Sequence, residues 1–200
     1  MAKKPKPKPP RRPKPYLWLL ILLSLLPSAL RAETPQVNIP PALRQQNWTE
    51  GRNNGSCVHA SAVTLWNWQG QYAWSNYWKR KYGGGEYDYR LHVRCDAEGV
   101  TYADTSDQGD EGFLEWACRT RRGCLIGIDA SAIYPGSSGG HALCVVHIDS
   151  KCVGILDNNG KYKIRYLDRK SFIRAWKAHG SWAWTPISTP PAPPLPRKAP

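Results

Sequence analysis

The sequence predicts an α+β domain, and three observations support this class. Segments with helical patterns come first, between residues 56 and 122. Three short apolar runs then follow one another between residues 141 and 167, separated by turn residues, as in an antiparallel meander. The 200 residues, 41% of them hydrophobic, are enough for one domain with a sizeable core. Helices followed by consecutive strands, without regular alternation of the two, are typical of α+β proteins.

Four segments are predicted to be helical. Ser56 can cap the first, whose apolar residues recur at helical spacing until Gly70 ends it. The second has an aromatic face and a basic end, and three consecutive glycines stop it. Gly123 stops the third, and Asp168 or Ser171 can cap the fourth. The expected ranges are 56–69, 72–82, 110–122 and 168–180.

Four further segments are predicted to be strands. Residues 124–130 are rich in β-branched side chains. Residues 141–149, 152–158 and 161–167 are expected to form three antiparallel strands joined by tight turns. Residues 86–111 are polar and rich in Gly and Asp, so we expect irregular structure there with a short strand or helix.

The ends of the chain differ in composition from the body. Residues 3–15 are basic and proline-rich, and they precede an apolar stretch of eleven residues that is followed by the small residue Ala32. This pattern is typical of a secretory signal, although membrane attachment through residues 16–30 stays open as an alternative. From Thr185 onward the chain is mostly proline, which predicts a semi-rigid tail. We therefore expect a signal peptide or anchor at residues 1–32, a folded domain at residues 33–184 and a tail at residues 185–200.

The formal net charge of +13 does not indicate a nucleic-acid partner, because the charge is concentrated at the ends. Residues 1–16 hold seven Lys or Arg and no acid, and Arg31, Arg197 and Lys198 add three more. Without these, 18 basic and 15 acidic residues remain, a balance of +3. The nearly balanced body is expected to work in an extracytoplasmic space, secreted or in the cell envelope.

The chain has six cysteines, and an oxidising location predicts that they form disulfide pairs. If Cys57 is kept for chemistry, five remain and one of them stays unpaired. If all six pair, Cys57 is structural. The six are Cys57, Cys95, Cys118, Cys124, Cys144 and Cys152.

Cys57 lies in "NNGSCVHAS", directly after a Gly-Ser turn and directly before a predicted helix. The positive end of a helix dipole stabilises a thiolate, which is the nucleophilic form of cysteine. His141 follows Gly139 and Gly140 at the start of a predicted strand, where it can work as a base. If residues 141–148 and 152–158 form a hairpin, Asp157 or Asn158 lies beside His141 and can orient its ring. A Cys, a His and an Asp or Asn in this order are the parts of a thiol hydrolase.

Several segments, in order, resemble the papain-like cysteine peptidases and their bacterial branch that includes the C39 peptidases. "GSCVHAS" resembles the nucleophile segment, "CLIGIDA" the strand before the catalytic His, and "GGHALCVVHID" the His strand. "VGILDNNG" resembles the strand that delivers Asp or Asn, and "IRYLDRKSFIRAW" the closing strand and helix. The resemblance covers roughly residues 45–184 and implies a central helix bearing the cysteine, packed on a C-terminal antiparallel sheet.

The resemblance implies Cys57 as nucleophile and His141 as base. The orienting residue is Asp157 in a C39-like alignment and Asn158 in a papain-like one. The family usually has a Gln shortly before the nucleophile as an oxyanion donor, but this chain has Gly51 at that position. We expect Asn54 to replace it, and the other candidates are Asn53, Gln46 and Gln45.

A zinc site at His141, Cys144 and His147 is the alternative considered for the histidines. On a strand, His141, Leu143, Val145 and His147 share one face, whereas Cys144 points the other way. The chain also has no Cys-x-x-Cys pair. We therefore expect neither a metal nor a cofactor.

Together these observations predict an exported cysteine peptidase that hydrolyses peptide or isopeptide bonds and has a peptide or protein as its substrate. Two alternatives stay open. One is an inactive module of the same fold that binds a peptide or an envelope partner, which a disulfide at Cys57 would favour. The other is a thiol acyltransferase, which products acylated on an added amine would favour.

Overall fold

The computed structural model of the protein describes four stretches of the chain, residues 34–48, 55–105, 110–160 and 163–187. The chain divides into two units, Met1–Thr34 and Pro35–Pro200, and all described helices and strands belong to the second. The expected signal or anchor segment and the oxyanion candidate Asn54 lie outside the described stretches. Among the helices within them, none has the length and apolar character needed to cross a membrane.

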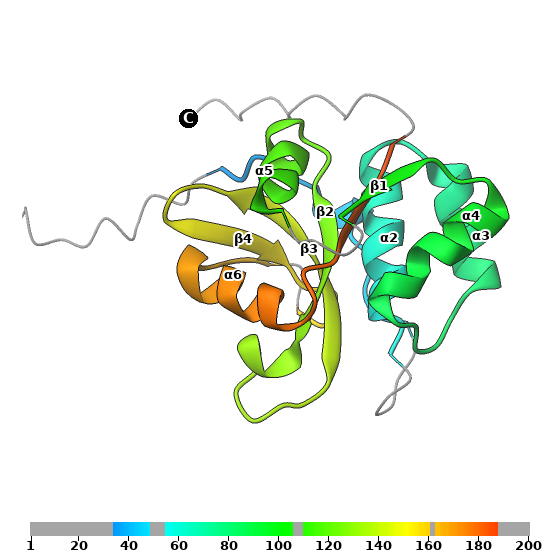
Figure 1. Cartoon of the computed structure of the whole chain (residues 1–200). Helices are drawn as coiled ribbons and strands as arrows, with labels where there is room; N and C mark the ends of the chain where they lie inside the picture. Colours follow the sequence, from blue (N-terminus) through cyan, green and yellow to red (C-terminus); the bar gives the residue numbers. More distant parts are fainter. Residues whose placement is uncertain (1–33, 49–54, 106–109, 161–162, 188–200) are drawn as a thin grey trace, which may run out of the picture. The chain divides into compact units, whose positions relative to one another are not determined.

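A six-stranded sheet forms the centre of the second unit (Figure 1), and all of its neighbouring strands are antiparallel. The strand order is β1-β6-β2-β3-β4-β5. The bounds are β1 Tyr102–Asp104, β2 Cys124–Asp129, β3 Gly140–Ile148, β4 Cys152–Leu156, β5 Ile164–Asp168 and β6 Ala183–Pro186.

Helices cover both faces of this sheet (Figure 1). The core on one face includes buried residues of α2, α3 and α4, whereas the core on the other includes residues of α5 and α6. The helices are α2 Cys57–Trp68, α3 Tyr72–Lys81, α4 Leu91–Glu98, α5 Glu111–Arg119 and α6 Arg169–Ala178. Three short 3₁₀ turns accompany them, η2 Pro41–Leu43, η3 Asp88–Arg90 and η4 Ala130–Ala132. The predicted α+β class is confirmed.

The predicted helices and strands form, with differences at their ends. Ser56 precedes α2 but its side chain does not cap the helix, because its hydroxyl bonds to residues before the turn instead. Asp168 caps α6 by accepting a hydrogen bond from the Ser171 N–H. The segment at 86–111 contains both α4 and β1. Strand β6 was not expected, and it takes Thr185 and Pro186 out of the expected tail because Thr185 is fully buried between β1 and β2.

An irregularity in β3 corrects the prediction that His147 shares a face with Leu143 and Val145. The register with β4 shifts between Val145 and His147, so that β3 has one extra residue there. As a result Ile148 packs in the same core as Leu143 and Val145. His147 instead lies opposite Gly154, on the other face of the sheet.

The expected disulfides do not form, although all six cysteines lie in the described part of the chain. Cys95, Cys118, Cys124 and Cys144 are buried and pack as small apolar residues in the two cores. The thiol of Cys144 donates to the Ser61 carbonyl oxygen at 3.5 Å. The correction leaves Cys57 outside any disulfide.

Gly127 of β2 lies directly against the side chain of Asp88 in η3. A Cβ atom at position 127 would come within 1.5 Å of Asp88 Oδ2, so η3 can dock here only on a glycine. We expect Gly127→Ala to lower the free energy of unfolding by about 1–3 kcal/mol, measured by urea denaturation. Adding Asp88→Gly should restore part of the loss, and strictly additive losses would contradict this explanation.

Candidate active site

Cys57 is the first residue of α2, and the segment before the helix fixes its position. The Ser56 hydroxyl donates to Asn47 Oδ1 at 2.5 Å and accepts from the Trp48 N–H at 2.9 Å. These bonds join Ser56, the residue before the helix, to Asn47 and Trp48. Cys57 is only partly buried, so its sulfur combines a helix N-terminus with access from outside.

His141, the second residue of β3, contacts both other members of the predicted set. Its Nε2 lies 2.9 Å from Asp157 Oδ1, and its ring is near enough to the Cys57 thiol to lower the pKa of that thiol. Because Nε2 is bonded to Asp157, Nδ1 is the ring nitrogen that remains to exchange a proton with the Cys57 sulfur. The structure thus brings Cys57, His141 and Asp157 together in a row.

The three groups alter one another's protonation. Burial raises the pKa of the Cys57 thiol, but the hydrogen bond and charge of His141 and the N–H groups of Ala142 and Val58 outweigh it and lower that pKa. Burial lowers the pKa of His141, but its bonds to Asp157 and Cys57 prevail and raise that pKa to about 9. Burial raises the pKa of Asp157, but the hydrogen bond and charge of His141, together with the Tyr134 hydroxyl and the Asn159 N–H, outweigh it and lower that pKa. These directions favour a thiolate–imidazolium pair at neutral pH.

Tyr134 is a fourth member of the site that the sequence analysis missed. Its hydroxyl donates to Asp157 Oδ2, and its ring lies 5.9 Å from the His141 ring. It comes from the turn that follows η4, inside the loop predicted between the first and second expected strands. Its only sequence signal was an aromatic residue in the loop that leads to His141.

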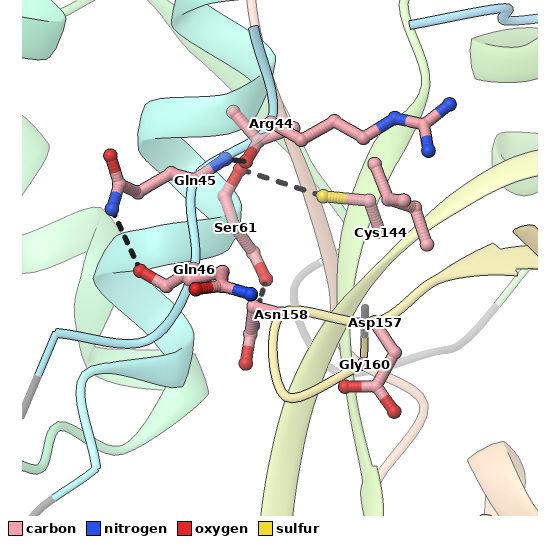
Figure 2. Close-up of a pocket in the computed structure, with 10 residues that line it drawn as sticks. Arg44, Gln45, Gln46, Ser61, Cys144, Asp157, Asn158 and Gly160 are labelled. Atoms are coloured by element: carbon pink, nitrogen blue, oxygen red, sulfur yellow. Dashed lines mark hydrogen bonds between the residues drawn. The ribbon is translucent and has the colours of Figure 1, made fainter. Parts of the chain in front are cut away.

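Asn158 is close to the site, but it does not contact His141 as the papain-like alignment implied. Its Nδ2 donates to the Cys57 carbonyl at 3.0 Å, the Ala142 carbonyl at 2.8 Å and Ser61 Oγ at 2.9 Å. Figure 2 shows the bond to Ser61, which lies on α2. Asn158 therefore joins α2, which bears Cys57, to β3, which bears His141, and Asp157 is the residue that bonds to the His141 ring.

Neither of the two candidate oxyanion donors in the described part of the chain, Gln45 and Gln46, is hydrogen-bonded to Cys57 or His141. Asn54 and Asn53 lie outside the described residues. Gln45 and Gln46 line a small cavity beside Asp157 and Asn158 (Figure 2). The Gln45 amide donates to the Gln46 carbonyl oxygen at 2.8 Å.

The residues considered for zinc do not come together. Cys144 bonds to α2 through the Ser61 carbonyl, and the irregularity in β3 turns His147 to the opposite face from Leu143 and Val145. Cys57, His141 and Asp157 are also not a group of metal-ligating atoms within 4.8 Å of one another in the described residues. Cys57, His141 and Asp157 are instead arranged so that a proton can move between the sulfur and the imidazole ring.

A helix that presents a cysteine at its start, packed against an antiparallel sheet whose His lies at a strand end, defines the papain-like class of folds. The comparisons agree with this class. A crystal structure from Bacillus anthracis, provisionally named a C39-like peptidase, matches with a TM-score of 0.59 and 12% identity. The match covers 78% of this chain and 98% of that one. No protein-family model and no curated protein sequence matches the chain.

The chain therefore has the papain-like fold in its C39-like form. At 12% identity this likeness establishes the fold, and the chemistry has to be argued from the site.

Proposed function

We propose that the protein is an exported cysteine peptidase that hydrolyses peptide or isopeptide bonds with Cys57 as nucleophile. The observation that carries the proposal is the row of contacts from the Cys57 sulfur through His141 to Asp157. Export rests on the basic and apolar pattern of residues 3–26. The structural neighbour's provisional name, a C39-like peptidase, supports the reaction class.

In the first half of the reaction the Cys57 thiolate attacks the carbonyl carbon of the substrate. The negative charge moves to the carbonyl oxygen, and the Cys57 N–H in the first turn of α2 is available to donate to it. The imidazolium of His141 then gives its proton to the leaving amine, and the C–N bond breaks. The product is a thioester on Cys57 and a free amine.

In the second half, neutral His141 takes a proton from water, and the hydroxide formed attacks the thioester. The C–S bond breaks, and the sulfur leaves as thiolate beside the reprotonated ring. Asp157 keeps Nε2 of His141 protonated throughout, so Nδ1 exchanges the proton at every step. Tyr134 holds the second carboxylate oxygen of Asp157 and so limits its rotation.

The proposal is tested first without a substrate, by the rate at which iodoacetamide alkylates each cysteine at neutral pH, read by mass spectrometry. We expect Cys57 to react selectively, because its pKa is lowered, whereas burial raises the pKa of Cys95 to well above its usual range. In His141→Ala the rate at Cys57 should fall about tenfold or more. Equal rates in both proteins would contradict an activated thiolate.

Peptidase activity is then measured on a mixed peptide library, with Cys57→Ala as the matched inactive control. New C-termini that carry oxygen from labelled water, in the wild type alone, are the expected result. Acylation of an added amine without hydrolysis would identify an acyltransferase. Binding of peptides without any turnover, together with an unreactive Cys57, would identify an inactive module.

A further inference from the structure

A second group of chemically competent side chains lies at the far end of β3 from His141. Within the described residues, His147, Asp149 and Cys152 are the group whose metal-ligating atoms all lie within 4.8 Å of one another. They come from one hairpin, in which His147 is the last residue but one of β3, Asp149 begins the turn and Cys152 opens β4. We propose that this hairpin binds a divalent transition-metal ion of the Zn²⁺ type through these three side chains, with water as the fourth ligand.

The irregularity in β3 is what brings the three together. The register shift between Val145 and His147 places His147 opposite Gly154. Side chains two residues apart on a strand share a face, so Cys152 lies on the same face as position 154. Without the extra residue in β3, His147 would point into the opposite core together with Val145. Gly154 provides room for the His147 side chain, because a Cβ there would come within 2.9 Å of His147 Cβ.

The separation of two of the ligand atoms fits a tetrahedral ion. His147 Nε2 and Asp149 Oδ2 are 3.3 Å apart. Bonds of about 2.0–2.1 Å to nitrogen and oxygen give a tetrahedral edge of about 3.3 Å. With a metal–sulfur bond of about 2.3 Å, the distance from the sulfur to each of the other two ligand atoms is about 3.6 Å. The three ligand atoms lie within 4.8 Å of one another, so the Cys152 sulfur needs to approach by about 1 Å at most.

The hairpin holds the carboxylate in place before any ion arrives. Asp149 Oδ1 accepts from the N–H groups of Lys151 and Cys152, both at 2.7 Å, which directs Oδ2 towards His147. The Asp149 N–H donates to the Cys152 carbonyl at 3.0 Å and closes the turn. The Tyr166 ring packs edge-on against His147 at 5.7 Å. Such supporting contacts orient metal ligands in known sites.

The chemistry of the donors selects the class of ion. One nitrogen, one oxygen and one sulfur suit a borderline cation such as Zn²⁺, whereas Ca²⁺ and Mg²⁺ prefer oxygen alone. On binding, the Cys152 thiol gives its proton to solvent and binds as thiolate. The nearby guanidinium of Arg169 contacts the Asp149 carbonyl, but Glu111 and Glu115 offset its charge. The Asp149 side chain is 34% exposed, which leaves an open side for the water ligand.

The hairpin is separate from the proposed active site. His147 is six residues from His141, which corresponds to roughly 20 Å along a strand. An ion on the hairpin therefore does not touch Cys57, and the two proposals can fail independently.

The test uses tag-free full-length protein and Co²⁺ as a spectroscopic probe for the site. We expect a thiolate-to-Co²⁺ charge-transfer absorption that Zn²⁺ abolishes by displacement. Cys57→Ser should keep the absorption and Cys152→Ser should lose it, which makes the two accessible cysteines matched controls for each other. Asp149→Asn keeps a side-chain oxygen that can accept from the N–H groups of Lys151 and Cys152, and it should weaken Zn²⁺ binding at least about tenfold.

Thermal unfolding provides the second readout, because an ion that binds the folded state raises Tm. Zn²⁺ should raise Tm in the wild type and in Cys57→Ser, should raise it less in Asp149→Asn, and should leave it unchanged in Cys152→Ser. No absorption in the wild type would overturn the proposal. An absorption that survives Cys152→Ser and disappears with Cys57→Ser would also overturn it, since it would place the ion at the other thiol.

Discussion

Replacing Asp157 with Asn is expected to narrow the pH range in which Cys57 and His141 form the proposed thiolate–imidazolium pair. Both the acid limit and the alkaline limit of that range should move inward. The charge of Asp157 stabilises the imidazolium of His141, and the imidazolium stabilises the thiolate. Without that charge, the proton leaves His141 below the wild-type pKa of about 9, so the alkaline limit of activity moves down. For the same reason the thiolate forms only at higher pH, so the acid limit moves up.

The geometry of the site permits this variant. An Asn oxygen at position 157 can still accept from His141 Nε2 and from the Asn159 N–H. Its amide group can donate to the Tyr134 oxygen, which in the wild type is the donor. Asp157→Ala, which also loses the orientation, should therefore cost more, about 10²–10⁴-fold in kcat/KM.

The measurement is the rate of Cys57 alkylation against pH, joined by kcat/KM against pH once a substrate is found. Tyr134→Phe is the matched control, because it removes a hydrogen bond from the same carboxylate and leaves the charge. Its two limits should move less than those of Asp157→Asn. An alkaline limit that stays near 9 in Asp157→Asn would show that the carboxylate charge does not hold the imidazolium.

The candidate site could be anticipated from the sequence because local signals mark its parts. Cys57 follows a turn and starts a helix, and His141 starts a strand after two glycines. The hairpin of β3 and β4 then places the end of one strand beside the start of the other. Distinguishing Asp157 from Asn158 needed the register itself. Consecutive residues point to opposite sides, so only one of the two can face His141.

Features fixed by contacts between distant parts of the chain could not be anticipated. Strand β6 is short and contains a proline, and it is defined by its pairing with β1 and β2. Tyr134 joins the site only because its loop folds over Asp157. The extra residue in β3 has no marker in its apolar sequence, yet it decides the face on which His147 lies.

Asn158→Ala is expected to have the other large effect, on stability and on the reactivity of Cys57 together. The Nδ2 group of Asn158 donates to the carbonyls of Cys57 and Ala142, and it is buried between α2 and β3. Removing it leaves buried acceptors without this donor, which should lower the free energy of unfolding by roughly 3 kcal/mol. Because the same bonds set the position of Cys57 relative to His141, alkylation of Cys57 at neutral pH should also slow down. Urea denaturation and the alkylation rate check the two effects.

Asn158→Asp distinguishes the contribution of the hydrogen bonds from that of side-chain packing, because Asp has nearly the same size as Asn but lacks the Nδ2 donor. A carboxylate at position 158 would face two carbonyl oxygens, so its pKa in the folded state would rise above that of the unfolded chain. The folded state would then bind the proton more tightly, and stability relative to the wild type should fall as pH rises through the acid range. Asn159→Asp is the matched control, because the side chain of Asn159 is exposed and should tolerate the charge at every pH. If both variants lose the same stability with the same pH dependence, Asn158 does not join α2 to β3 in the way its three hydrogen bonds indicate.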